Sequence, residues 1–209
     1  MSSQSSIIDK LDAFIRKYYK NRLLKGLLYS AAFLLVLYIV IVVLEYFGYF
    51  SVSVRTFLFW FFIVAMTFIV TYFVAIPLLK MFRLGKRISF QTAATIIGDH
   101  FPEVNDKLLN LLQLQEMDSS ADNELLQASI EQKTKQLSPI PFVNAIDLRG
   151  NVKYVKYVAI PLLFIVVSLI VAPSFITEPS KRIIDHGTFY ERPAPFSFIL
   201  GNKDLTAFQ

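Results

Sequence analysis

Two histidines are the side chains that first suggest acid–base chemistry in this sequence. His100 follows Asp99, and His186 follows Asp185. A general base needs a pocket and a positioned partner within hydrogen-bond reach. His100 lies at the predicted end of a solvated helix and His186 in a polar segment, so we interpret both as surface residues. Because the chain has no cysteine, disulfides and thiolate zinc sites are excluded, and a multi-histidine metal centre would need carboxylates or another chain as ligands.

Sequence motifs for phosphate binding and hydrolysis do not occur. Gly85 and Lys86 are followed by Arg87, with no glycine five residues earlier, so they do not form a P-loop. The chain also has no HExxH, GxSxG or glycine-rich dinucleotide motif. Glu103 and Asp106 stand at i,i+3, which is typical of a solvated helix face. We therefore predict that the protein is not an enzyme, with no catalytic residue, cofactor, metal ligand or evident small-molecule substrate.

Polar side chains inside long apolar segments are the usual place for a transport path. Thr67 and Thr71 can bond to carbonyls of their own helix, and no ionisable side chain stands near the middle of an apolar segment, as a proton or ion path normally requires. Glu45 lies within reach of Arg55 across a short connection. We interpret these two as an interfacial ion pair, with a gating or partner-binding charge as the alternative. The polar side chains inside the segments include Tyr38, Thr67, Thr71, Tyr72 and Ser168.

The polar side chains just described lie in or beside three apolar blocks of the sequence, which must position them. Of the residues, 55% are apolar and 18% are charged, and the mean hydropathy is +0.50. Residues 26–44, 56–79 and 157–177 contain no Asp, Glu, Lys or Arg, and each block approaches or exceeds the roughly 20 residues that a helix needs to cross about 30 Å of hydrocarbon. The sequence predicts an all-α integral membrane protein with a two-helix transmembrane hairpin over 26–79 and a third transmembrane helix over 157–176.

Lysine and arginine are distributed unevenly around these spans. Six precede the first span, only Arg55 separates the first two, four follow the second and three precede the third. Because basic residues accumulate on the cytoplasmic side, we place the N-terminus and residues 80–156 in the cytoplasm and residues 46–55 and 177–209 in the periplasm of a bacterium. The net charge of +5 follows from these basic flanks, so no nucleic acid is expected. The predicted partners are the lipid bilayer and other inner-membrane and periplasmic proteins.

Residues 1–25 have the pattern of a basic amphipathic helix. Apolar and aromatic side chains, among them Phe14 and Tyr18, recur at helical spacing, with lysines and an arginine between them. Such a helix lies against anionic headgroups ahead of a span. The alternative is that its aromatic stripe packs on a partner subunit.

Residues 80–156 are predicted to form a cytoplasmic helical insert. Its body, 88–148, has nine acids against three lysines. Ser89 can cap a first helix, a second follows Pro102, and a third ends before Pro139. Helices this short are marginal alone, so they must pack together or onto a partner. The candidate partner-contact residues of the chain are Phe14, Tyr18, Leu108, Leu111, Leu112, Leu126 and Ile130.

Residues 177–209 have a different composition. The pattern predicts an extended lead-in, then strands over 196–200 and 205–208 separated by a turn at Gly201 and Asn202. A lone hairpin is marginal in water. We therefore expect the start of a β-rich periplasmic domain that belongs to a longer protein.

Two sequence motifs, together with this order of elements, resemble those of a known group of proteins. The insert contains His100-Phe101-Pro102-Glu103-Val104-Asn105-Asp106-Lys107-Leu108-Leu109-Asn110, and Arg192-Pro193-Ala194-Pro195-Phe196 precedes the predicted strand. With the amphipathic helix and the three spans, the chain resembles large uncharacterised inner-membrane proteins of the Bacteroidota type, which are labelled as domains of unknown function or, loosely, as ATPases. The resemblance covers essentially the whole chain and implies a long periplasmic continuation. It supplies no catalytic residues, and the nucleotide loop that an ATPase needs is missing.

Three functions fit these expectations. The leading hypothesis is a non-enzymatic anchor and scaffold subunit of an envelope complex, in protein export or envelope assembly. The alternatives are an accessory subunit of a transporter or channel, and a protein that relays a periplasmic signal through its third span.

Overall fold

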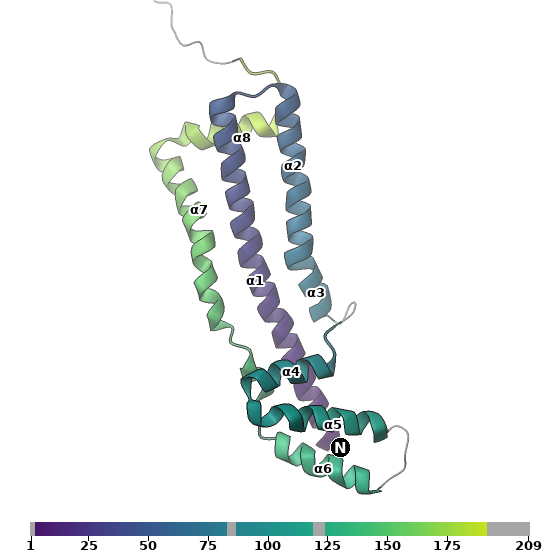
Figure 1. Ribbon diagram of the computed structural model, residues 1–209. Helices are drawn as coiled ribbons and strands as arrows, with labels where there is room; N and C mark the ends of the chain where they lie inside the picture. The colour runs from purple at the N-terminus through teal and green to yellow at the C-terminus, as the bar shows by residue number, and fades with distance from the viewer. Residues whose placement is uncertain (1–2, 83–86, 119–123, 192–209) are drawn as a thin grey trace, which may run out of the picture.

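The computed structural model describes residues 3–82, 87–118 and 124–191, and it describes the side chains of 7–82, 87–114 and 127–191. All secondary-structure elements within these ranges are helices (Figure 1). Three of them are long and apolar enough to cross a membrane, which confirms the predicted helical fold and the three predicted helices of that length and composition. The predicted strands, 196–200 and 205–208, lie outside the described residues.

Helix α1, Ser3–Gly48, runs the whole length of the molecule (Figure 1). Its 46 residues correspond to about 69 Å at 1.5 Å per residue, which is more than twice the thickness of a hydrocarbon core. The expected separate helix over 1–25 is therefore wrong, because this segment and the first span form one continuous helix. A single glycine, Gly26, stands near the expected boundary, and it does not end the helix.

The second span consists of three helical segments in series, which run antiparallel to α1. They are α2 (Val52–Val70), the π-helical segment η1 (Thr71–Ala75) and α3 (Ile76–Met81). Pro77 has no backbone N–H, so the carbonyl of Phe73, four residues earlier, loses its α-helical donor. A Cβ built on Gly26 would lie 1.9 Å from that carbonyl oxygen. Gly26 therefore allows α1 to approach the π-helical segment closely.

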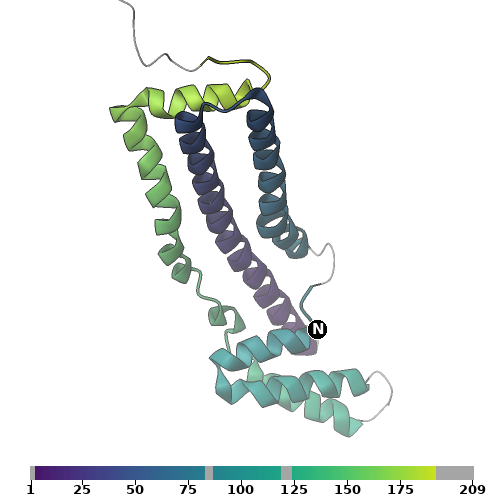
Figure 2. The ribbon, with the colours of Figure 1, turned by 45° about the horizontal axis from the view of Figure 1, so that its top comes forward.

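The third span, α7 (Val152–Val171), ends earlier than the expected residue 176. A second helix, α8 (Pro173–Ile184), begins directly after Ala172, whose φ of −144° and ψ of 73° are not helical. A residue that precedes proline is disfavoured in the α conformation, so Pro173 separates the two helices. Figure 2 shows that α8 lies across the ends of α7, α1 and α2. The expected extended lead-in is thus wrong for residues 177–184, which are helical.

The other end of the molecule is a compact group of helices, which we call the helical cap. Ser89 begins it as predicted, since its Oγ accepts a hydrogen bond from the backbone N–H of Thr92 at 3.1 Å. The short 3₁₀ segments η3 and η4 then lead into α7. The segments are α4 (Phe90–His100), η2 (Pro102–Val104), α5 (Asn105–Asp118), α6 (Glu124–Leu137), η3 (Phe142–Ala145) and η4 (Arg149–Asn151).

The core of the cap is built partly from the N-terminal third of α1. This corrects both expectations for residues 1–25, because their apolar stripe faces neither headgroups nor another subunit but the chain's own insert. The short helices α4 and α6 gain a long partner helix in this way, which removes the instability of isolated short helices. Buried side chains of this core are Ile7, Leu11, Phe14, Ile15, Tyr19, Ala93, Ala94, Ile97, Leu108, Leu111, Leu112 and Ile130.

Candidate functional site: a buried charge cluster at the end opposite the cap

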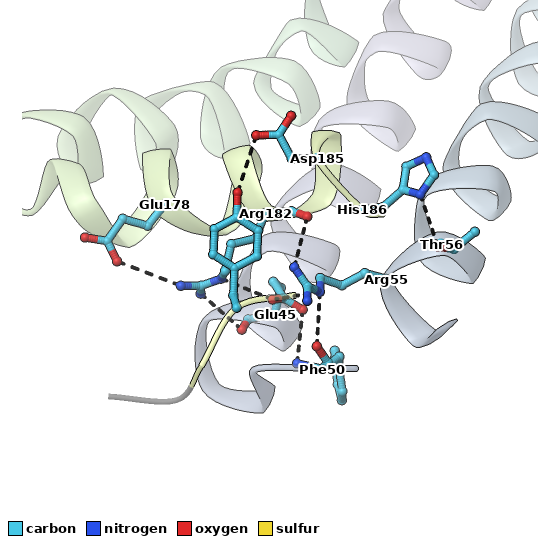
Figure 3. Close-up of polar contacts among 9 residues, drawn as sticks. Glu45, Phe50, Arg55, Thr56, Glu178, Arg182, Asp185 and His186 are labelled. Carbon is cyan, nitrogen blue, oxygen red and sulfur yellow. Dashed lines mark hydrogen bonds and ion pairs between the residues drawn. The ribbon is translucent and has the colours of Figure 1, made fainter. Parts of the chain in front are cut away.

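Three helices meet at the end of the spans that lies away from the cap. The last turn of α1 supplies Glu45, the first turns of α2 supply Arg55, and α8 supplies Arg182 (Figure 3). All three side chains are buried, with exposed fractions of 0%, 0% and 6%. Because burying a charge is costly unless it is paired and hydrogen-bonded, the contacts of these three residues determine how the helix ends are held.

Glu45 is the acceptor at the centre of the cluster. Its Oε1 accepts a hydrogen bond from Nε of Arg182 at 3.1 Å and lies 3.9 Å from Nε of Arg55. Its Oε2 accepts from the backbone N–H of Phe50 at 3.4 Å. The predicted pair of Glu45 and Arg55 is confirmed, and the structure adds Arg182 as the closer cation.

Arg55 is tied to the backbone on both sides of the connection. Its Nε donates to the carbonyl of Phe50 at 3.0 Å, and its Nη1 donates to the carbonyl of Arg182 at 3.5 Å. The guanidinium also lies over the ring of Tyr190, 5.0 Å from its centroid. Its buried Nη2 has no hydrogen-bond partner among the described residues. Arg55 therefore joins the α1–α2 connection to the C-terminal part of α8.

Arg182 connects α8 to α1 through both its charge and its ring contact. Besides the bond to the carboxylate, its Nη2 donates to the backbone carbonyl of Glu45 at 3.4 Å. Its guanidinium lies over the ring of Tyr49 at 4.2 Å, which is a favourable cation–π distance. Glu178, 3.9 Å from Nη1, is 58% exposed and adds little. Two buried guanidinium groups thus share a single buried carboxylate.

The segment that follows α8 is held against α2 by a hydrogen bond and a ring contact. His186 Nδ1 lies 3.0 Å from the hydroxyl of Thr56, and its ring contacts Phe59 with centroids 4.7 Å apart. Asp185 accepts a hydrogen bond from the Tyr190 hydroxyl at 3.4 Å and is exposed. His186 is therefore a packing residue at the α2–α8 contact, and not the free surface residue that we expected.

The cap end places most of the candidate partner-contact residues in its own core. Phe14, Leu108, Leu111, Leu112 and Ile130 are buried together there, and Tyr18 packs against them partly buried. The side chain of Leu126 lies outside the described ones. His100, Glu103 and Asp106 are exposed, as expected for surface residues. A partner of the cap would have to contact the exposed outer faces of its helices.

Polar groups of the spans are used for local or helix–helix contacts. Thr67 donates to the carbonyl of Ile63 at 2.9 Å, as predicted. The hydroxyl of Tyr38 on α1 lies 2.7 Å from that of Ser180 on α8. Among the described residues no group of three His, Asp or Glu side chains could hold a metal ion. The charge cluster therefore holds three helix ends together through ion pairs.

Sequence reasoning missed Arg182, although a signal for it existed. Ile176, Pro179, Arg182 and Ile183 are the buried residues of α8, and their spacing of three, three and one is that of one helical face. The proline at 179 conceals this pattern, because proline normally argues against a helix interior.

Comparison with protein-family models, with curated proteins and with solved structures finds no match for this chain.

Proposed function

We propose that this chain is a non-enzymatic anchor and scaffold subunit of an envelope complex in a bacterial inner membrane, serving protein export or envelope assembly. In this proposal the helical cap is cytoplasmic and α8 is periplasmic. The accumulation of Lys and Arg at the cap ends of the spans supports the orientation. The resemblance to large Bacteroidota-type inner-membrane proteins is part of the same proposal.

The continuity of α1 is the observation that supports this function most strongly. One end of this helix forms part of the cap core through side chains such as Phe14, and the other end carries Glu45 of the charge cluster. A helix without a break holds its two ends at a fixed distance and orientation. A subunit built in this way is suited to keep a module on one side of a membrane in register with a module on the other.

A mainly aromatic stripe on α2 and η1 supplies a surface for a partner helix. The stripe consists of side chains three or four residues apart, each between 48% and 70% exposed. Two pairs within it stack, Phe57 with Phe61 and Phe68 with Tyr72. Aromatic residues are enriched in the cores of protein–protein interfaces. The members of the stripe are Phe57, Phe61, Val64, Phe68 and Tyr72.

Co-purification in mild detergent tests the scaffold proposal. We expect the unmodified chain to co-purify with at least one other membrane protein, and Phe61→Ala with Phe68→Ala to lose it. The matched control is Leu163→Ala with Ile170→Ala on α7, whose side chains are exposed by 63% and 76% and which should retain the partner. Recovery of the unmodified chain as a monomer alone would contradict the proposal.

Signal relay is the second candidate, and one contact favours it. Arg182 ties α8 to the end of α1 at 3.1 Å from the Glu45 carboxylate, and the opposite end of the same helix packs against α4 and α6. A displacement of α8 would therefore act directly on a helix that forms the cap core.

Hydrogen exchange distinguishes relay from a passive scaffold. Arg182→Gln breaks the link to Glu45, whereas Lys181→Gln changes an exposed neighbour by the same charge. Relay predicts faster amide exchange in α4 and α6 for the first variant and not for the second. Unchanged exchange in both variants would leave the scaffold proposal intact and exclude the relay.

A further inference from the structure

An apolar cavity that is open to the outside lies between α1 and α7, at the cap end of the spans. Its volume is about 320 Å³, within the range of about 300–1,000 Å³ that ligand pockets have. We call it the slot. It is lined by Tyr29, Ala32, Phe33, Val36 and Tyr157.

Three lysines surround two tyrosines at the mouth of the slot, and we call them the lysine rim. Lys25 and Lys153 lie over the ring of Tyr154, at 6.0 Å and 5.2 Å from its centroid. That ring contacts Tyr29 of the slot, with centroids 5.1 Å apart. The third lysine, Lys156, lies 5.3 Å from the ring centroid of Tyr157, also of the slot.

The rim is positively charged. Within the described part of the chain, none of Lys25, Lys153 and Lys156 forms an ion pair with a carboxylate. A cation over an aromatic face keeps N–H groups free for an anion. The rim therefore offers donors and positive charge immediately beside an apolar cavity.

The dimensions match one leaflet of a bilayer. Lys25 and Val36 are eleven residues apart on the continuous helix α1, which is about 16 Å. Half of a hydrocarbon core of about 30 Å is close to that length. A phosphate at the level of the lysine rim would thus place its acyl chain along the slot, as far as the middle of the membrane.

We propose that the slot and the lysine rim form a binding site for one anionic phospholipid, with its phosphate on Lys25, Lys153 and Lys156 and an acyl chain between α1 and α7. The site lies at the seam of two spans, so the bound lipid fills a gap in their packing. The ligand class follows from charge complementarity and from the apolar cavity together, and it does not depend on the orientation of the protein or on its scaffold role.

Quenching of a tryptophan in the slot by brominated lipid tests the site on the full chain. Trp60 is the only tryptophan, so Trp60→Phe with Tyr157→Trp gives a single probe in the slot. The protein is reconstituted in phosphatidylcholine vesicles that contain brominated phosphatidylglycerol as a minor component, and in the same vesicles with brominated phosphatidylcholine instead. We expect about a tenfold preference for the anionic lipid at the probe.

Matched variants separate a site from a general charge effect. Lys25→Gln, Lys153→Gln and Lys156→Gln together should remove the preference, whereas Lys107→Gln, Lys133→Gln and Lys135→Gln in the cap change the net charge equally and should keep it. Val36→Phe should reduce quenching by filling the slot. Val40→Phe alters a side chain on the same helix that is equally exposed, 47% against 50%, and should not.

Three results would overturn the proposal. Equal quenching by the two brominated lipids would show that the slot does not distinguish headgroups. Loss of the preference in the cap variant would assign it to the net charge of the protein. Abolition of the preference by inorganic phosphate, but not by sodium chloride of equal ionic strength, would make the rim a site for a soluble anion.

Discussion

At the scale of single residues, Glu45 determines how one end of the molecule is held together. Its carboxylate is fully buried and, among the residues that the structure describes, is the only buried carboxylate beside the buried guanidinium groups of Arg55 and Arg182. Removing one member of a buried ionic network leaves the other charges uncompensated, which costs far more than the net stabilisation by the network. The buried Nη2 of Arg55, which has no partner among the described residues, makes the cluster still more dependent on this carboxylate.

The Glu45→Gln variant should therefore be strongly destabilised. We expect the free energy of unfolding to fall by about 3–5 kcal/mol, measured by circular dichroism during denaturation in detergent micelles. Glu178→Gln is the control, because that carboxylate is 58% exposed and 3.9 Å from Arg182. It should cost about 0–1 kcal/mol. Equal stability of the two variants would contradict the central position of Glu45.

The sequence allowed only part of this cluster to be predicted. Glu45 and Arg55 flank a short connection, so their proximity follows from the hairpin alone. Arg182 is 137 positions from Glu45 along the chain, and their contact depends on where α8 lies. No local pattern specifies that placement, because it results from the break at Ala172 and from the packing of α8 across three helix ends.

At the scale of elements, the contact between α1 and the second span depends on a glycine. The carbonyl of Phe73 has no α-helical donor, because Pro77 has no backbone N–H. Its oxygen lies 1.9 Å from the position that a Cβ on Gly26 would take. Small residues allow the backbones of membrane helices to approach each other closely. The π-helical segment and Gly26 thus form one packing unit, which aligns the spans near the cap.

Gly26→Ala should separate these two helices. A Cβ at 1.9 Å from a backbone oxygen cannot be accommodated by a side-chain rotation, so α1 and the π-helical segment η1 must move apart. We expect a lower unfolding midpoint and a longer distance between spin labels on the two helices. Gly187→Ala is the control, because nothing lies within 4 Å of its added Cβ. An unchanged distance in Gly26→Ala would show that the contact is not tight.

Some boundaries of the cap helices could be predicted from neighbouring residues alone. Ser89 with the following apolar pattern predicted α4, and Pro139 predicted the end of α6. In contrast, the continuity of α1 could not be predicted from its basic, amphipathic first part. That pattern is common to interfacial helices and to helices that pack on a soluble core. The surface that covers it, α4 to α6, is distant in sequence.

At the scale of the whole molecule, three long apolar helices separate the cap from α8. Hydropathy and length specify these spans almost completely, because a helix that crosses hydrocarbon needs a long uninterrupted apolar stretch. The same three helices leave large apolar side chains exposed over most of their length, as a surface in contact with lipid would. We propose that the two folded ends lie in different aqueous compartments.

Labelling of engineered cysteines tests this claim directly, since the chain has none of its own. Lys107→Cys lies on α5 of the cap, Lys181→Cys on α8, and both native side chains are exposed. With a thiol reagent that cannot cross membranes, we predict that intact spheroplasts react at position 181 and that position 107 reacts only after permeabilisation. Modification of both positions in intact spheroplasts would contradict the account.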